Sequence, residues 1–341
     1  MPADKQAADR LVATWLLVCC GLVFAMVVLG GVTRLTGSGL SIVEWRPVSG
    51  VLPPLSEQAW QDAFDQYRDS PEFRQVNSHM DVHDFKGIYW LEYLHRLLGR
   101  TIGVVFLLPF LVFLWKGHIQ KRELPKYLLM FVLGGLQGAL GWYMVMSGLV
   151  ENPHVSHYRL TAHLVAAFLI YAYMLWVALS LLYPGTGESK HPWYGRTVAL
   201  TALVSLTIVS GGLVAGLKAG KIYNTFPMMG DYWLPPGMLS LEPAWRNFLD
   251  NLATVQFDHR LLAISTFALI LVYWFYVRRA DLPARLRKAV NALVHTAVLQ
   301  VALGISTLLL FVPTLLAASH QAVAMLLFTV ALYLCHGLRR A

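Results

Sequence analysis

The sequence predicts an all-α integral membrane protein, with eight transmembrane helices arranged as two tandem, pseudo-symmetric four-helix bundles. Three observations predict this fold. The 341 residues are 57% hydrophobic and 13% charged, with a mean hydropathy of +0.53, whereas a soluble domain carries about 25% charged residues. The apolar residues are gathered into long blocks, and the second half of the chain repeats the pattern of the first.

Each apolar block is about 20 residues or longer, which is enough for a helix to cross an apolar core of about 30 Å. Helices satisfy their backbone N–H and C=O groups internally, as hydrocarbon demands. The first block is too long for the apolar part of a signal peptide, and we expect it to be retained. The expected spans are 11–33, 91–115, 127–148, 158–182, 196–217, 256–277, 288–312 and 317–337.

The distribution of charge predicts the orientation of the chain. If both termini are inside, the inner segments are the termini, 116–126, 184–196 and 278–288, which hold 15 Lys and Arg against 5 Asp and Glu. The rest of the chain holds 12 against 14. This is the positive-inside pattern. It predicts cytoplasmic termini in a cell inner membrane, and it accounts for the net charge of +8 without a nucleic-acid partner.

The outer loops are expected at about 34–89 and 218–254, and both are rich enough in aromatic residues to form compact caps on the membrane surface. The three cysteines, Cys19, Cys20 and Cys335, all lie within spans. No disulfide framework is therefore expected in the outer loops.

The internal repeat keeps the same order in both halves. An even number of spans in each unit gives the units the same orientation, so the repeat is parallel. We expect an N-terminal half, 1–183, and a C-terminal half, 184–341. The matched segments are "GGVTRLTGSG" (30–39) with "GGLVAGLKAG" (211–220), "EYLHRLLG" (92–99) with "QFDHRLLA" (256–263), "LQGALG" (136–141) with "LQVALG" (299–304), and "LTAHLVAAFL" (160–169) with "AASHQAVAML" (317–326).

Four histidines occupy repeat-related positions, His95 with His259 and His163 with His320. All four lie near the outer ends of their spans, so each half should bring two imidazoles to one depth. Such a pair can ligate a heme iron from both faces. A buried imidazole without a partner costs roughly 2–7 kcal/mol, which ligation or a hydrogen bond to a neighbouring helix avoids. Zinc is disfavoured, because no cysteine or carboxylate is repeated beside the histidines.

Arginines accompany these histidines. Arg96 and Arg260 each follow one, and Arg159 lies one turn outward of His163. They are candidate contacts for heme propionates, which guanidinium groups pair with in bidentate fashion. The alternative is an interfacial arginine that reaches to the headgroups. For Arg100, propionate contact and interfacial anchor remain equal alternatives.

The repeat breaks at one polar position, where Glu92 in the first half is replaced by Gln256 in the second. Glu92 precedes His95 by three residues, so both lie on one helix face. A carboxylate there can accept a proton or stabilise a developing positive charge, whereas an amide can only hydrogen-bond. The asymmetry indicates chemistry in the first half and a permanent cofactor in the second. The alternative is an ion pair with Arg96 or Arg100.

The remaining histidines carry weaker signals and are interpreted by position. His154 and His157, beside the fourth span, are expected at the surface or rim, and His118, His191 and His336, on the inner side, are expected to be solvated or interfacial. His295, in the seventh span, is expected to form an internal hydrogen bond. For His79 and His83, in the first outer loop, a metal site is a minor alternative.

Over nearly its whole length the chain resembles the heme A synthase family of the alphaproteobacterial and mitochondrial type. The resemblance rests on "GGVTRLTGSGLSIVEWRPVSGVLPP" (30–54), "DFKGIYWLEYLHR" (84–96), "RLTAHL" (159–164), "NTFPMMG" (224–230), "QFDHR" (256–260) and "SHQAVAMLL" (319–327). It implies an enzyme for cytochrome oxidase assembly that oxidises the C8 methyl group of heme O to a formyl group by successive hydroxylation.

The resemblance also implies the roles of particular residues. His95 and His163 would flank the substrate heme O, and His259 and His320 would ligate a heme b cofactor. Glu92 matches the family's essential glutamate. A consistent hypothesis is electron removal from the methyl carbon followed by attack of water, with Glu92 stabilising the cation or taking up the proton.

Partners and rival functions follow from the same residues. Candidate partners are the lipid bilayer, a heme O synthase, an electron acceptor and a second copy of the chain. The first rival is a di-heme membrane cytochrome b that exchanges electrons with quinone, which would use the four histidines without Glu92. The second is a transporter with two rocking halves, which is disfavoured because no span is broken by Gly or Pro in both halves.

Overall fold

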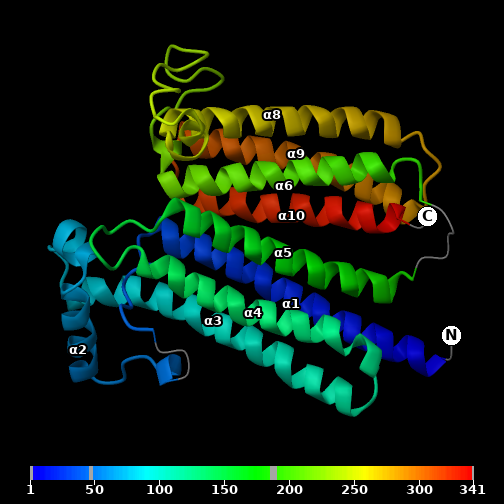
Figure 1. The fold of residues 1–341 in the computed structure, drawn as a ribbon, viewed down its shortest axis with the longest axis horizontal. Coiled ribbons are helices and arrows are strands. Elements are labelled where there is room, and N and C mark those ends of the chain that lie inside the picture. The colour runs from blue at the N-terminus through cyan, green and yellow to red at the C-terminus, as the bar shows by residue number, and fades with distance from the viewer. Residues whose placement is uncertain (1–2, 46–48, 185–189, 340–341) are drawn as a thin grey trace. The chain divides into compact units, whose positions relative to one another are not determined.

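The computed structural model describes residues 3–45, 49–184 and 190–339. Within these residues the chain is helical, and its only β-structure is an isolated bridge between Met229 and Tyr232. Eight of the described helices are long and apolar enough to cross a membrane, so the predicted fold class is confirmed (Figure 1). They are α1 (Ala3–Leu35), α3 (Val82–Trp115), α4 (Leu124–Met146), α5 (His157–Leu182), α6 (Tyr194–Leu217), α8 (Leu252–Val277), α9 (Ala284–Leu309) and α10 (Thr314–Leu338).

Most of these helices begin and end within a few residues of the predicted spans, but α1 and α3 begin about two turns earlier. α3 begins at Val82, where the side chain of Asp81 caps it by accepting the backbone N–H groups of His83 and Asp84. The predicted outer loop 34–89 is therefore shorter than expected. Residues 46–48 of that loop and residues 185–189 of the inner segment 184–196 lie outside the described residues, as do both chain ends.

The residues between α1 and α3 include the helix α2 (Glu57–Arg68), which lies beside the start of α3 (Figure 1) and forms a small aromatic cluster with it. They also include η1 (Ser49–Val51) and the π-helical turn η2 (Phe73–Asn77). Trp60, Phe64 and Tyr67 of α2 are buried against Phe85 of α3. Each buried aromatic side chain contributes roughly 1.5–3 kcal/mol. This packing explains why α3 continues beyond the apolar block.

Polar contacts complete this cluster. The Tyr67 hydroxyl donates to Oε2 of Glu72 at 3.1 Å and accepts from Nδ2 of Asn77 at 2.8 Å. Burial raises the pKa of Tyr67, so the phenol keeps the proton that it donates to the Glu72 carboxylate.

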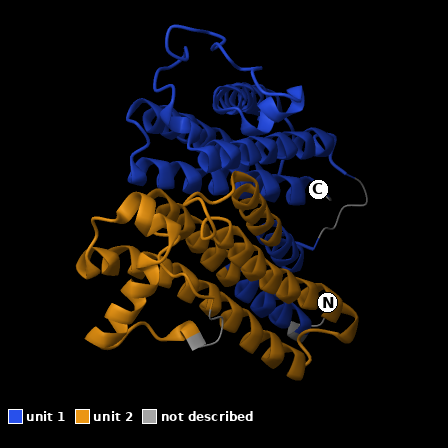
Figure 2. Ribbon diagram, turned by 60° about the vertical axis from the view of Figure 1, so that its left-hand side comes forward, with its two compact units in different colours: residues 1–17, 171–341 blue, residues 18–170 orange. Residues whose placement is uncertain are grey.

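The described chain divides into two compact units (Figure 2). In chain order we call residues 18–170, which are orange and marked unit 2 in the figure, the first unit, and residues 1–17 with 171–341, which are blue and marked unit 1, the second unit. The first unit holds α2, α3, α4, the second half of α1 and the first half of α5. The second holds α6 to α10 with the remaining halves of α1 and α5. The predicted assignment of 1–183 to a substrate half and 184–341 to a cofactor half stays a prediction.

In the second unit the long helices form a closed ring, in which α6 packs on α8, α8 on α9, α9 on α10, and α10 on α6. Hydroxyl pairs join α6 to α8, from Thr197 to Tyr273 at 2.7 Å and from Thr207 to Thr266 at 2.8 Å. Such interhelical bonds are how polar side chains are satisfied among apolar helices. The fully buried side chains of this ring include Ile270, Leu286, Leu293, Met325 and Leu334.

The loop between α6 and α8 is held together by asparagine side chains. It contains the short elements η4 (Ala219–Lys221), η5 (Ala244–Arg246) and α7 (Asn247–Asp250). Asn247, fully buried, donates to the carbonyl oxygens of Leu241 and Ala244. Asn251 caps α8 by accepting the backbone N–H groups of Ala253 and Thr254. In the first unit, the short η3 (Lys121–Glu123) leads directly into α4.

Candidate functional site

The structure places the four repeated histidines on four different long helices, two in each unit. His95 lies on α3 and His163 on α5, while His259 lies on α8 and His320 on α10. All four side chains are half-buried. Each unit therefore contains one histidine pair, carried by two different helices. The ligation of heme by these pairs stays a prediction.

A glycine on a facing helix lies against each of the four rings. A Cβ atom built on Gly141 would lie 2.9 Å from Cε1 of His163, and one on Gly304 would lie 2.8 Å from Cε1 of His320. The corresponding distances are 3.1 Å from Gly211 to Cε1 of His259 and 3.0 Å from Gly30 to Nε2 of His95. The glycines come from α1, α4, α6 and α9. Every imidazole thus occupies space that any side chain larger than hydrogen would take.

This arrangement fits a heme held between two imidazoles in each unit. The donor set is two histidines from facing helices, which is a common ligand set for low-spin heme iron in helical bundles. The glycines let each ring pack closely against the backbone of the facing helix. The donor set does not resemble a zinc site, because no cysteine joins either pair of rings.

Hydrogen bonds orient three of the four rings. Nδ1 of His259 is 2.8 Å from Oγ of Ser210, and Nδ1 of His320 is 3.1 Å from the main-chain oxygen of Gln300. In the first unit Nε2 of Gln137 is 3.2 Å from Nδ1 of His163. The segments "LQGALG" and "LQVALG" already contained both the glutamines and the facing glycines, but their roles required the structure.

Glu92 is buried, with 3% of its surface exposed, and four donors surround its carboxylate. Oε2 accepts from Oγ of Ser41 at 2.7 Å and from the backbone N–H of Ile42 at 2.9 Å. Oε1 accepts from Nε and Nη2 of Arg96 at 3.1 and 2.7 Å. Glu92 therefore forms an ion pair with Arg96, which was one of the alternatives considered from the sequence. It also ties the segment after α1 to α3.

Gln256, the counterpart of Glu92, has a simpler environment. It is also 3% exposed, and its Nε2 donates to the main-chain oxygen of Tyr223 at 3.0 Å. Its Oε1 is buried with no hydrogen-bond partner among the described residues. The two units therefore differ at this position in charge and in the number of donors that meet it.

Arg96 and Arg260 hold the loop that follows the first long helix of their unit. Arg96 donates to the main-chain oxygens of Ile42 and Glu44 at 2.8 and 2.9 Å. Arg260 donates to the main-chain oxygens of Tyr223, Thr225 and Met228 at 2.8, 2.9 and 3.1 Å.

Arg159 is bound in another way. It donates to the main-chain oxygen of Tyr143 at 2.8 Å, and its guanidinium carbon lies 3.7 Å from the centre of that residue's ring. Arg100 lies one turn along α3 from Arg96. The predicted propionate contacts of these arginines stay predictions.

Of the weaker histidines, His336 differs most from expectation. It was expected to be solvated or interfacial, but it is 5% exposed. Its Nε2 lies 3.0 Å from Oγ of Ser180, and its ring packs edge-on against Trp176. The expectation was wrong because the end of α10 packs against the end of α5 in the second unit, so the last turn is not solvated.

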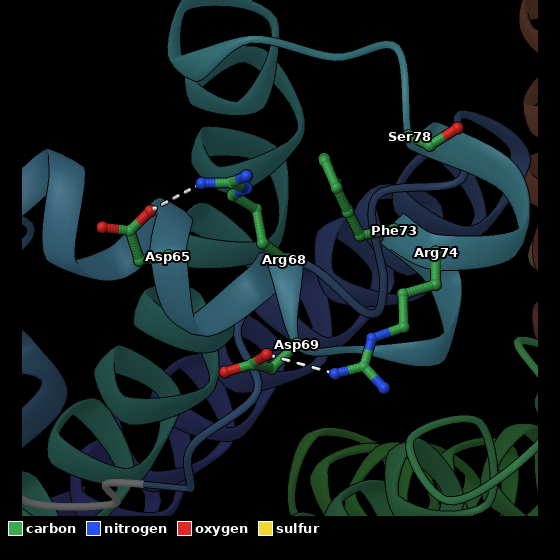
Figure 3. A pocket seen from close by; sticks show the side chains of 6 residues that line it. All are labelled: Asp65, Arg68, Asp69, Phe73, Arg74 and Ser78. Atoms are coloured by element: carbon green, nitrogen blue, oxygen red, sulfur yellow. Dashed lines mark hydrogen bonds and ion pairs between the residues drawn. The ribbon is translucent and has the colours of Figure 1, made fainter.

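The first outer loop contains two further polar groupings. Ligand atoms of Asp81, His83 and Asp84 lie within 4.8 Å of one another, and all three residues are exposed. A surface pocket between α2 and η2 has its charged side chains paired, Arg68 with Asp65 at 3.4 Å and Arg74 with Asp69 at 3.1 Å (Figure 3). The pocket is lined by Asp65, Arg68, Asp69, Phe73, Arg74 and Ser78, and none of the four repeated histidines borders it.

Comparison with known proteins identifies the family of the chain. The cytochrome oxidase assembly protein family COX15-CtaA matches residues 13–332. The chain belongs to this family. It is accordingly a multi-pass membrane protein, and the family involves heme.

Relatives within the family come from bacteria and from eukaryotes. The heme A synthase of Nitrosospira multiformis is 53% identical, over 99% of this chain and 96% of the relative. The heme A synthase COX15 of Arabidopsis thaliana is 45% identical, over 98% of this chain and 76% of the relative. The human heme A synthase COX15 is also 45% identical, over 98% of this chain and 84% of the relative.

Proposed function

We propose that this protein is a heme A synthase that oxidises the C8 methyl group of heme O to a formyl group, for cytochrome oxidase assembly. The observation that carries the proposal is the repeated histidine pair with a carboxylate beside only one copy. Two equivalent electron carriers would not need that difference. The names of relatives that match nearly the whole chain support the same reaction.

The first unit is the proposed substrate site, with His95 and His163 flanking heme O. The second unit is the proposed cofactor site, with His259 and His320 ligating heme b. Heme b, when bound, supplies a one-electron relay between the substrate and an acceptor. The protein's part is to hold the rings in place, which the facing glycines and the hydrogen bonds to Nδ1 support.

Glu92 is the proposed catalytic residue, and its environment favours one of its two suggested roles. Its four lone-pair positions already receive donors from Ser41, Ile42 and Arg96. A further proton could be accepted only if one of these donors left. A fixed carboxylate of this kind is suited to stabilising positive charge that develops at the methyl carbon while water attacks. Gln256 could not do this.

The arginines are the proposed propionate contacts, with a condition set by their present partners. Arg96, Arg159 and Arg260 donate to main-chain oxygens. A propionate would have to share these donors, so recognition of the substrate would be coupled to the position of the loops. Such sharing is available to Arg because its planar group carries five N–H donors.

The proposed location is a cell inner membrane with both termini in the cytoplasm and the heme sites near the outer side. The support is the excess of Lys and Arg in the segments joining alternate helices. A heme O synthase and an electron acceptor are the proposed partners, since the reaction needs a supply of heme O and a destination for electrons.

The heme content of the purified protein tests the proposal. We expect heme b together with heme O or heme A, and a hydroxylated intermediate, when extracted hemes are separated by chromatography. His259→Ala should lose the heme b and its low-spin spectrum. Two equivalents of heme b with no other heme would instead identify a di-heme cytochrome b and end the proposal.

A further inference from the structure

The second histidine of each pair meets its glutamine through different atoms. In the first unit, Nε2 of Gln137 lies 3.2 Å from Nδ1 of His163. In the second unit, the main-chain oxygen of Gln300 lies 3.1 Å from Nδ1 of His320. The two glutamines occupy the same place in the repeat. The partner of Nδ1 is therefore a side-chain amide in one unit and a carbonyl in the other.

The contacts of Gln137 identify which atom of His163 carries the proton. Nε2 of Gln137 also lies 2.9 Å from the main-chain oxygen of His163. That oxygen can only accept, so the atom facing it is the amide NH₂ group. The same NH₂ group must then donate to Nδ1 of His163. A neutral imidazole has one N–H group, and in His163 it is consequently on Nε2, the nitrogen that the iron would need.

The second unit has the opposite arrangement in both of its histidines. The carbonyl oxygen of Gln300 can only accept, so His320 carries its proton on Nδ1. Oγ of Ser210 donates its own hydrogen to the main-chain oxygen of Thr207 at 2.8 Å, so it accepts from Nδ1 of His259. Both rings therefore carry no proton on Nε2. In His320 this atom lies 3.4 Å from the side-chain Nε2 of Gln300, a contact that iron would displace without moving a proton. A ligating histidine that donates its other N–H to an oxygen is held in the ligating tautomer and made more basic.

We propose that Gln137 is a positioning residue that keeps His163 an exchangeable ligand of the heme in the first unit, while Ser210 and the main chain of Gln300 make His259 and His320 permanent ligands. The proposal rests on the proposed function. For iron to bind Nε2 of His163, the proton must move to Nδ1 and the amide of Gln137 must turn. The turned amide loses its bond to the carbonyl of His163. A substrate that must leave as product benefits from such a ligand, and a cofactor does not.

Heme release from purified protein tests this proposal. Protein loaded with heme O is mixed with excess apomyoglobin, and the transferred heme is identified by chromatography as its absorbance appears. Gln137→Glu replaces the donor by an acceptor for Nδ1–H, so heme O should leave about 10–100-fold more slowly. The matched variant Gln300→Met keeps the carbonyl that contacts Nδ1 of His320 but removes the amide that lies 3.4 Å from Nε2 of that ring. Because this change lies in the second unit, it should leave the release of heme O at the wild-type rate.

Retained heme b shows that each variant is folded. Unchanged or faster release of heme O from a folded Gln137→Glu protein overturns the proposal. If that variant does not assemble, the nitrogen NMR shifts of His163 in heme-free wild-type protein decide, since the proposal requires the proton on Nε2 in His163 and on Nδ1 in His320. A protein that takes up no heme O refutes the proposed function, while the NMR shifts still test the role of Gln137.

Discussion

At the scale of single residues, the glycines that face the histidines are expected to decide whether heme binds. A Cβ at Gly304 would come within 2.8 Å of His320, and one at Gly141 within 2.9 Å of His163, whereas one at Gly138 would meet nothing within 4 Å. We expect Gly304→Ala to weaken heme binding in the second unit, and Gly141→Ala in the first, by about 10–100-fold. Heme content and low-spin absorbance of the purified variants measure this.

Gly138→Ala is the matched control, because it makes the same change on the same helix as Gly141 with open space around it. Alanine favours a helix over glycine by about 1 kcal/mol, so loss of helix stability cannot explain a difference between the two variants. Equal heme loss in Gly138→Ala and Gly141→Ala would show that crowding of the ring is not the cause.

Glu92 should matter through its charge as well as through its hydrogen bonds. Glu92→Gln keeps the shape and removes the charge, and we expect the production of heme A from supplied heme O to fall about 10²–10³-fold. Breaking the buried pair with Arg96 should also cost about 3–5 kcal/mol of stability, which a thermal unfolding curve measures. Undiminished heme A production by Glu92→Ala or Glu92→Gln would rule out the catalytic assignment.

The histidines and Glu92 could be selected from the sequence because the repeat separates shared positions from the one that differs. Their partners could not be selected in this way. Ser41 reaches Glu92 from 51 positions away, and no periodicity relates a loop residue to a helix at that distance. Ser210 has Leu29 as its counterpart in the other half, so the repeat gave no signal for it either.

At the scale of elements, the start of α3 should depend on pH through its cap. The backbone N–H of Asp84, and then that of His83, hold the pKa of Asp81 below its ordinary value of 3.8. A lowered pKa means that the carboxylate stabilises the folded helix start above the ordinary carboxyl range, and that this stabilisation disappears as the pH falls through the lowered pKa. Hydrogen-exchange protection of the first turn of α3 should fall over that range.

Asp81→Asn provides the control for this prediction, because asparagine also caps helices but carries no charge. Its first-turn protection should not change over the same acid range, and Asp81→Ala should lack the protection at every pH. If Asp81→Asn loses protection in acid as the wild type does, another carboxyl group is responsible.

The early start of α3 shows what hydropathy misses. Residues 82–90 contain His83, Asp84 and Lys86, so in the sequence the apolar block begins only at Leu91. The helix continues outward because Phe85 packs on α2. Span prediction measures transfer to lipid, and it contains no term for an aromatic cluster contributed by another segment.

At the scale of the whole molecule, the distribution of Lys and Arg predicts the orientation of the chain in the membrane. A fluorescent protein that matures only in the cytoplasm should be bright when fused after the C-terminus, since the inner segments carry the excess of Lys and Arg. A periplasmic phosphatase inserted in the loop between α6 and α8 should be active. A dark C-terminal fusion together with an inactive loop fusion would reverse the assigned orientation.

The repeat predicted two four-helix bundles, but equivalent helices of the two units differ in how closely they are packed, which the repeat did not predict. Gly134 and Gly138 of α4 have open space beside them, whereas their counterparts on α9 are Ala297, which is buried, and Val301. Gly134 and Gly138 are exposed, so the equivalent part of α9 is packed more closely than this part of α4. Such packing depends on which side chains of neighbouring helices come into contact, and an alignment of the two halves does not contain that information.

The way in which Arg96 and Arg260 hold their loops has a consequence for how the two halves could diverge. Both guanidinium groups bind main-chain oxygens, and every amino acid supplies that oxygen. A loop held in this way can change nearly all its amino acids and still accept the hydrogen bonds of the arginine. Duplicated halves could therefore acquire different outer loops, one suited to a substrate and one to a permanent cofactor. The arginine that binds each loop could stay the same.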